Sequence, residues 1–139
     1  MAASADTQET VVTAEIVEGD LSMSQPNDLT FSAVLKDQAQ TIDLDPIHTT
    51  ITDYRSKKGW ELTVESSNFE SYAPNYQLLV NDVAIDNTSK SVYINTDQST
   101  IQAINLPVNV EISADAKTGS YTADLEWNLQ PNTKHSLKE

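Results

Sequence analysis

Residues 120–129 read SYTADLEWNL, and this stretch decides the fold class. Its apolar and aromatic residues occupy every second position: Tyr121, Ala123, Leu125, Trp127 and Leu129. In a β-strand all five side chains share one face, because successive side chains point to opposite sides. Trp60 and Leu62 repeat the same spacing around Glu61. Two apolar strand faces of this kind need another layer to cover them.

The rest of the chain shows the same alternation in shorter pieces. No segment has a helical period long enough to predict a helix. The pattern predicts further strands at residues 10–17, 29–35, 47–54, 60–65, 76–83, 91–95 and 100–106, with Val108, Val110 and Ile112 facing one way. Residues 55–59 are expected to join 47–54 to 60–65 as a hairpin. Residues 66–75 are expected to form a loop, because Pro74 cannot donate a ladder hydrogen bond.

Strands without helices must bury their apolar faces against each other. The expected fold is therefore all-β, an antiparallel β-sandwich, with an immunoglobulin-like arrangement or a partly closed barrel as the alternatives. A chain of 139 residues with 38% hydrophobic content is enough for one domain. We expect a disordered leader at residues 1–9, the domain at 10–132 and a disordered tail at 133–139.

Charge and composition exclude several classes of function. Eight basic residues against 21 acidic ones give a net charge of −13. Nucleic acid is not an expected partner, because binding it requires cations that neutralise phosphates. The absence of cysteine excludes disulfides, thiolate metal sites and cysteine nucleophiles. No apolar run is long enough to span a bilayer, so no membrane insertion is expected.

Several short motifs, taken in order, carry a resemblance to a known family. They are GDLS at 19–22, LTF at 29–31, DYR at 53–55, GWELTV at 59–64, LP at 106–107 and GSYTADLEWNL at 119–129, followed by Pro131. With these the chain resembles a WxL domain, a family of Gram-positive surface proteins named for two Trp-x-Leu motifs. Here the two motifs are Trp60-Glu61-Leu62 and Trp127-Asn128-Leu129.

The resemblance implies a secreted, cell-wall-associated protein with no catalytic activity and no cofactor. It implies non-covalent attachment to peptidoglycan and assembly with companion cell-surface proteins. A wall-binding module predicts an exposed aromatic groove, and Tyr54, Tyr72 and Tyr76 are the candidate contacts. The alternative is a protein-interaction module held at the surface by a companion protein. It predicts a flat apolar or edge-strand surface that binds by strand addition.

The sequence also predicts the roles of individual residues. Trp60 and Trp127 are expected in or near the core, since each shares its strand face with other apolar residues; exposed platforms for sugar rings are the alternative. Glu61 and Asn128 should point away from that face. Asp53 and Arg55 are expected to pair as a clamp on the hairpin that ends at Gly59.

No catalytic or metal-ligating set is expected. The acidic and amide residues of two runs lack the spacing of a calcium loop and are interpreted as turn-forming: Asp43, Asp45 and Asp53, and Asn81, Asp82, Asp86 and Asn87. His48 and His135, the two histidines, form neither a triad nor a metal pair with recognisable neighbours.

Overall fold

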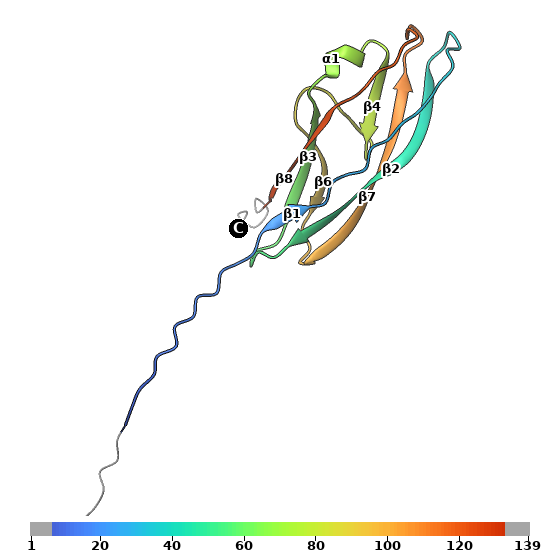
Figure 1. Ribbon diagram of the computed structural model, residues 1–139. Helices are drawn as coiled ribbons and strands as arrows, with labels where there is room; N and C mark the ends of the chain where they lie inside the picture. The colour runs from blue at the N-terminus through green and yellow to red at the C-terminus, as the bar shows by residue number, and fades with distance from the viewer. Residues whose placement is uncertain (1–6, 133–139) are drawn as a thin grey trace, which may run out of the picture.

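Two antiparallel sheets, packed face to face, form the body of the molecule (Figure 1). The computed structural model describes residues 7–132; the predictions for 133–139 and for the first six residues of the leader lie outside this range. The elements are β1 (Leu21–Met23), β2 (Gln40–Asp53), β3 (Trp60–Ser66), α1 (Phe69–Tyr72), β4 (Tyr76–Val80), β5 (Val83–Ala84), β6 (Lys90–Asn95), β7 (Ile101–Ile112) and β8 (Leu125–Pro131).

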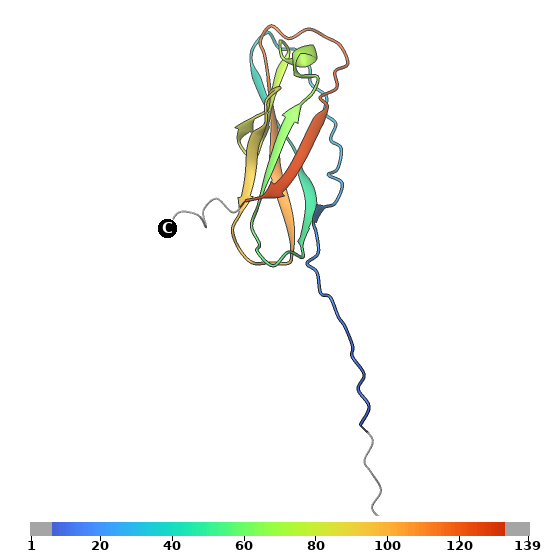
Figure 2. The same cartoon turned by 90° about the vertical axis from the view of Figure 1, so that its left-hand side faces the viewer.

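One sheet has the strand order β1-β2-β7-β4-β5 and the other has the order β6-β3-β8. Figure 2 shows the two sheets as layers. At their edges β1 lies beside β8 and β5 lies beside β6, so the layers approach each other on both sides. The predicted all-β antiparallel sandwich is confirmed.

The two Trp-x-Leu motifs lie on neighbouring strands. In the antiparallel register of β3 and β8, Leu62 lies opposite Leu129 and Val64 lies opposite Trp127. Both tryptophans therefore share the inward face of one sheet. Trp60 is 1% exposed and stacks on Tyr93 at a ring centroid distance of 5.3 Å, whereas Trp127 is only partly buried. Trp60 is thus a core residue, as predicted, and Trp127 lies at the margin of the core.

The predicted hairpin at residues 47–65 is wrong. β2 pairs with β1 and β7, while β3 pairs with β6 and β8, so the turn at 54–59 carries the chain from one sheet to the other. Alternation on both sides of a turn does not distinguish a hairpin from such a crossing. Here β7 and β1 occupy both edges of β2 next to the turn, so β3 has no edge there to pair with.

Two predicted strands, at residues 10–17 and 29–35, are absent. Both segments are extended, but neither makes a backbone hydrogen bond to another strand within the described residues. Residues 120–124 also lie outside a strand, so β8 begins only at Leu125. Alternation provides a face, but a strand also needs a neighbouring edge to pair with.

The strand predicted at 76–83 is divided by a two-residue turn. Asn81 and Asp82 both have positive φ, at 51° and 66°, between the paired residues Val80 and Val83. Positive φ at both central positions is the geometry of a type I′ hairpin turn, which Asn and Asp tolerate. The predicted turn-forming role of these two residues is confirmed.

The predicted strand at 100–106 and the alternating positions that follow it form one strand, β7, which runs through Pro107. The register between β2 and β7 shifts between Leu44 and Ile47, opposite this proline. The Pro107 carbonyl accepts a hydrogen bond from the Asn81 backbone N–H at 2.7 Å. A bulge on the neighbouring strand thus accommodates a residue that has no N–H to donate. The loop predicted at 66–75 contains the single turn of α1.

Replacing Trp60 with alanine tests whether the motif is structural. Because its indole is buried and stacked, we expect Trp60→Ala to lower the free energy of unfolding by about 3–5 kcal/mol in urea denaturation. Asn128→Ala on the exposed face of β8 is the control, with an expected change within about 0.5 kcal/mol. Equal effects of the two substitutions would contradict the packing described for Trp60.

Candidate binding site at the open seam

One side of the sandwich, between β8 and β2, is closed by a strand only near the end of β2, where β1 lies beside β8. We call this side the open seam and define it by β8 and by residues 40–49 of β2. Among the described residues, β8 pairs only with β3, and the last backbone hydrogen bond from β1 or its extension to β2 runs from Ser24 to Thr50. On the opposite side, between β5 and β6, Ile85 and Val92 are buried. The side between β5 and β6 is therefore closed along the core, whereas the other side has no strand beyond β1, between β8 and residues 40–49 of β2.

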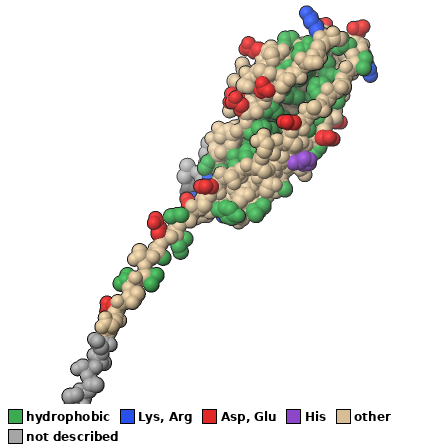
Figure 3. Space-filling view, in the orientation of Figure 1, with side chains coloured by type: hydrophobic (Ala, Val, Ile, Leu, Met, Phe, Trp, Pro, Cys, Tyr) green, Lys and Arg blue, Asp and Glu red, His purple; other side chains and the backbone are tan. Residues whose placement is uncertain are grey.

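Apolar residues line the open seam without being fully covered. Six of them are partly buried and pack against the core: Leu29, Ile42, Leu44, Leu125, Trp127 and Leu129. Figure 3 shows hydrophobic side chains gathered along this side of the molecule. An unpaired strand edge and a strip of half-covered apolar surface thus coincide, which is the combination that accepts an added strand.

Residues 25–35 cross the open seam in extended form, and we call them the strap (Figure 2). The Asn27 amide accepts a hydrogen bond from the His48 backbone N–H at 2.7 Å and donates one to the Pro46 carbonyl at 3.3 Å. Gln40 donates from Nε2 to the Val34 carbonyl at 2.9 Å. All of these partners belong to β2. The strap's hydrogen bonds therefore go to β2, while Leu29 packs against the core and the Phe31 ring lies edge-on to Tyr76 of β4 at 5.6 Å. No backbone hydrogen bond joins the strap to β8 in the described residues.

Two of the three tyrosines predicted to contact a ligand are instead in the core. Tyr72 is fully buried and Tyr76 is 7% exposed, and their rings stack at 4.7 Å. The Tyr72 hydroxyl donates to Ser66 Oγ at 2.8 Å, and burial raises the pKa of Tyr76 to about 12. Only Tyr54 is exposed, at 59%. The sequence contains the signal for Tyr76, because it shares its strand face with the buried residues Leu78 and Val80.

Asp53, Arg55 and Gly59 lie together, where the chain crosses between the sheets. Arg55 donates from Nε to Asp53 Oδ1 and from Nη2 to Asp53 Oδ2, each at 2.8 Å, and also from Nη2 to the Gly59 carbonyl at 2.8 Å. Gly59 has a φ of 125°, which side chains disfavour. These contacts clamp the end of β2 to the start of β3, so the residues fasten a crossing loop and not the hairpin that the sequence predicts.

The clamp is an electrostatically matched pair within the protein. Asp53 is 1% exposed and the Arg55 side chain is 15% exposed. Hydrogen bonds from Arg55 hold the pKa of the Asp53 carboxyl below its ordinary value, against the opposing effect of burial. The same hydrogen bonds raise the pKa of Arg55. These contacts engage both carboxylate oxygens of Asp53 and the Nε and Nη2 of Arg55 within the protein, which is typical of a structural pair.

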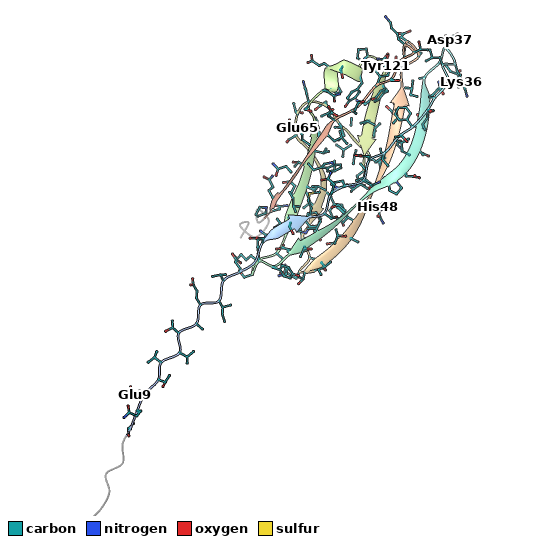
Figure 4. The ribbon with its side chains drawn as sticks, viewed as in Figure 1. Glu9, Lys36, Asp37, His48, Glu65 and Tyr121 are labelled. Carbon is teal, nitrogen blue, oxygen red and sulfur yellow. The ribbon has the colours of Figure 1, made fainter. Side chains whose placement is uncertain are left out.

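A shallow hollow with a mostly apolar lining lies over β2 and β7. It is lined by Asp43, Leu44, Pro46, Asn105, Pro107, Val108 and Asn109. Asn109 donates from Nδ2 to Asp43 Oδ1 at 3.3 Å, and His48, labelled in Figure 4, hydrogen-bonds through Nδ1 to Asn105 Oδ1. The polar groups of this hollow are those of Asp43, Asn105 and Asn109, with His48 beside it. The sequence analysis did not identify the hollow, because its residues meet only through strand pairing.

Within residues 7–132 no group of three or more His, Asp or Glu side chains is placed to hold a metal ion. None of the helices in this range has the length and apolar character that crossing a bilayer requires. Glu61 is partly buried and Asn128 is exposed. His135 lies outside the described residues.

Removing one member of the clamp should destabilise the fold. We expect Asp53→Asn to lower the free energy of unfolding by about 3–5 kcal/mol, because it leaves a largely buried guanidinium without its counter-charge. Urea denaturation measures this change. The control is Asp86→Asn. The Asp86 carboxylate lies 3.5 Å from the Lys90 ammonium, and both side chains are about one-third exposed. This substitution should change the free energy of unfolding by less than about 1 kcal/mol. A larger effect at Asp86 would contradict this ranking.

The contribution of the clamp should depend on pH. Because the pKa of Asp53 in the folded chain lies below its ordinary value of 3.8, acidification protonates the unfolded state first. The stabilisation is complete above the pH at which an unfolded aspartate titrates, and it is lost as the pH falls through the folded pKa. The difference in unfolding free energy between the wild-type chain and Asp53→Asn should therefore shrink on acidification below that range. A difference that stays constant would contradict the pairing.

Comparisons with known proteins add no family to these observations. No protein-family model matches the chain, and no curated protein matches it. The likeness to the WxL domain therefore rests on the two Trp-x-Leu segments and their flanks, and attachment to a cell wall remains a prediction.

Proposed function

We propose that this chain is a non-catalytic interaction module of the Gram-positive cell surface, which binds a companion surface protein by strand addition at the open seam. The observation that carries the proposal is the unpaired edge of β8 beside partly buried Leu125, Trp127 and Leu129. A strand bound there gains backbone hydrogen bonds and covers apolar surface in one step. The location at the cell surface is taken from the resemblance of the Trp-x-Leu motifs.

The buried tyrosines favour this function over direct recognition of glycan by aromatic residues. A sugar-binding groove needs exposed ring faces, but Tyr72 and Tyr76 stack on each other inside the domain. Of the three tyrosines only Tyr54 is exposed. Two further exposed rings, Phe31 and Tyr121, lie edge-on against the buried Tyr76 and so pack on the core.

Attachment to peptidoglycan is the second candidate function, and the polar side chains in and beside the hollow on β2 and β7 favour it. Asn105, Asn109 and His48 offer neutral donors and acceptors of the kind that bind sugar hydroxyls. The net charge of −13 opposes binding to anionic wall polymers, so the ligand would be neutral glycan or the peptide stem.

Two probes separate the candidate functions on the isotopically labelled chain. The first is the ectodomain of a companion surface protein of the kind that the WxL resemblance implies, and the second is peptidoglycan stripped of protein and teichoic acid. We expect the ectodomain to shift the backbone amide resonances of Leu125, Trp127 and Leu129 and to leave those of Asn105 and Asn109 unchanged.

Co-sedimentation with the stripped peptidoglycan, beside a heat-denatured control, tests the second candidate. Saturable binding by the folded chain alone, with no effect of the ectodomain on β8, would overturn the proposed function in favour of wall binding. Binding of neither probe would overturn both.

A further inference from the structure

An arm of strand-forming sequence projects from the domain without a partner. Residues 10–17 read TVVTAEIV, and four of their side chains are at least 74% exposed: Val11, Val12, Ile16 and Val17. Figure 1 shows this arm leaving the body of the molecule, and Figure 4 labels Glu9 near its far end. The arm makes no hydrogen bond with the rest of the described chain before Glu18. β-branched residues of this kind favour strands, and moving them out of water into an apolar contact is favourable.

The base of the arm is fixed, and this directs the arm away from its own open seam. The Gly19 N–H donates to the Tyr54 carbonyl at 3.2 Å, and the Tyr54 N–H donates to the Asp20 carbonyl at 3.0 Å. The Glu18 carboxylate accepts hydrogen bonds from Ser56 N–H and Oγ at 2.7 and 2.8 Å. A Cβ on Gly19 would lie 2.5 Å from Tyr54 Cβ, so only glycine allows this approach. With these contacts in place, residues 10–17 would have to reverse direction to reach the seam of the same molecule.

The β8 edge presents the backbone groups that such an arm lacks. The Asn132 N–H donates to the Gly59 carbonyl, and this bond shows which residues of β8 have backbone groups that point toward β3. They are every second residue from Asn132 back along β8. Since backbone groups alternate in direction along a strand, those of Leu125, Trp127 and Leu129 point away from β3 and toward the open seam. β8 has seven residues and the arm segment has eight, so the lengths match.

We infer that residues 10–17 of one copy of this chain add as a strand to the β8 edge of a second copy. Val12, Ala14 and Ile16 lie on one face of the arm and would cover the apolar strip of the seam, while Thr13 and Glu15 face water. The inference rests on the proposed function, because it uses the same edge. It names a second copy of this chain as the partner.

Sedimentation velocity over rising concentrations of the full chain tests this self-association. We expect the wild-type chain to associate and the double variant Val12→Asp/Ile16→Asp to remain monomeric. The matched control is Thr7→Asp/Thr13→Asp, which adds the same charge at two positions that do not share the face of Val12 and Ile16, one just before the arm and one within it, and should still associate. A monomeric wild-type chain, or equal association of all three proteins, would overturn the inference.

The receiving edge is tested by adding unlabelled wild-type chain to the labelled Val12→Asp/Ile16→Asp variant. We expect shifts of the Leu125, Trp127 and Leu129 amides; shifts confined to β6 or to the outer face of β2 would overturn the assignment to β8. The same variant keeps its own β8 edge, so it should still bind the companion ectodomain. Ectodomain binding without self-association would therefore overturn this inference alone, and the reverse result would overturn the proposed function alone.

Discussion

The antiparallel pairing of β3 with β8 is the interaction on which the rest of the structure depends. It sets Leu62 opposite Leu129 and Val64 opposite Trp127, and so builds one apolar face from two segments far apart in the chain. That face covers the five-stranded sheet and buries Trp60 against Tyr93. The same pairing uses only one edge of β8. The feature that completes the core on one side therefore creates the unpaired edge on the other.

A second constraint holds the two layers in relation to each other. The chain passes from the end of β2 to the start of β3 in a short loop, where Arg55 contacts both Asp53 and the Gly59 carbonyl. The bidentate geometry fixes direction as well as distance, which a single point charge would not do. Gly19 packs against Tyr54 in this loop, so the base of the arm is fixed to the same crossing as the sheets. Body and arm thus share one anchoring region.

Alternation in the sequence predicts the all-β class and the inward face of Trp60, because both depend on local side-chain direction. It does not predict strand partners. The segments at 10–17 and 29–35 alternate as well as β3 does, yet neither is paired in the described structure. The predicted hairpin is wrong for the same reason, because tertiary contacts decide which sheet a strand joins. Tyr76 was assigned to a ligand site although its position relative to Leu78 predicts burial. The open seam has no local signature, because it is defined by an absent neighbour.

Association through an unpaired apolar edge should depend on salt concentration when the protein is strongly anionic. Each copy carries a net charge of −13, so copies repel one another as they approach. At physiological ionic strength this repulsion is screened beyond about 8 Å, whereas in dilute salt it extends to about 30 Å. Strand addition acts only at contact distance and is not screened in this way. Salt thus determines how closely copies approach, while the open seam determines what happens when they meet.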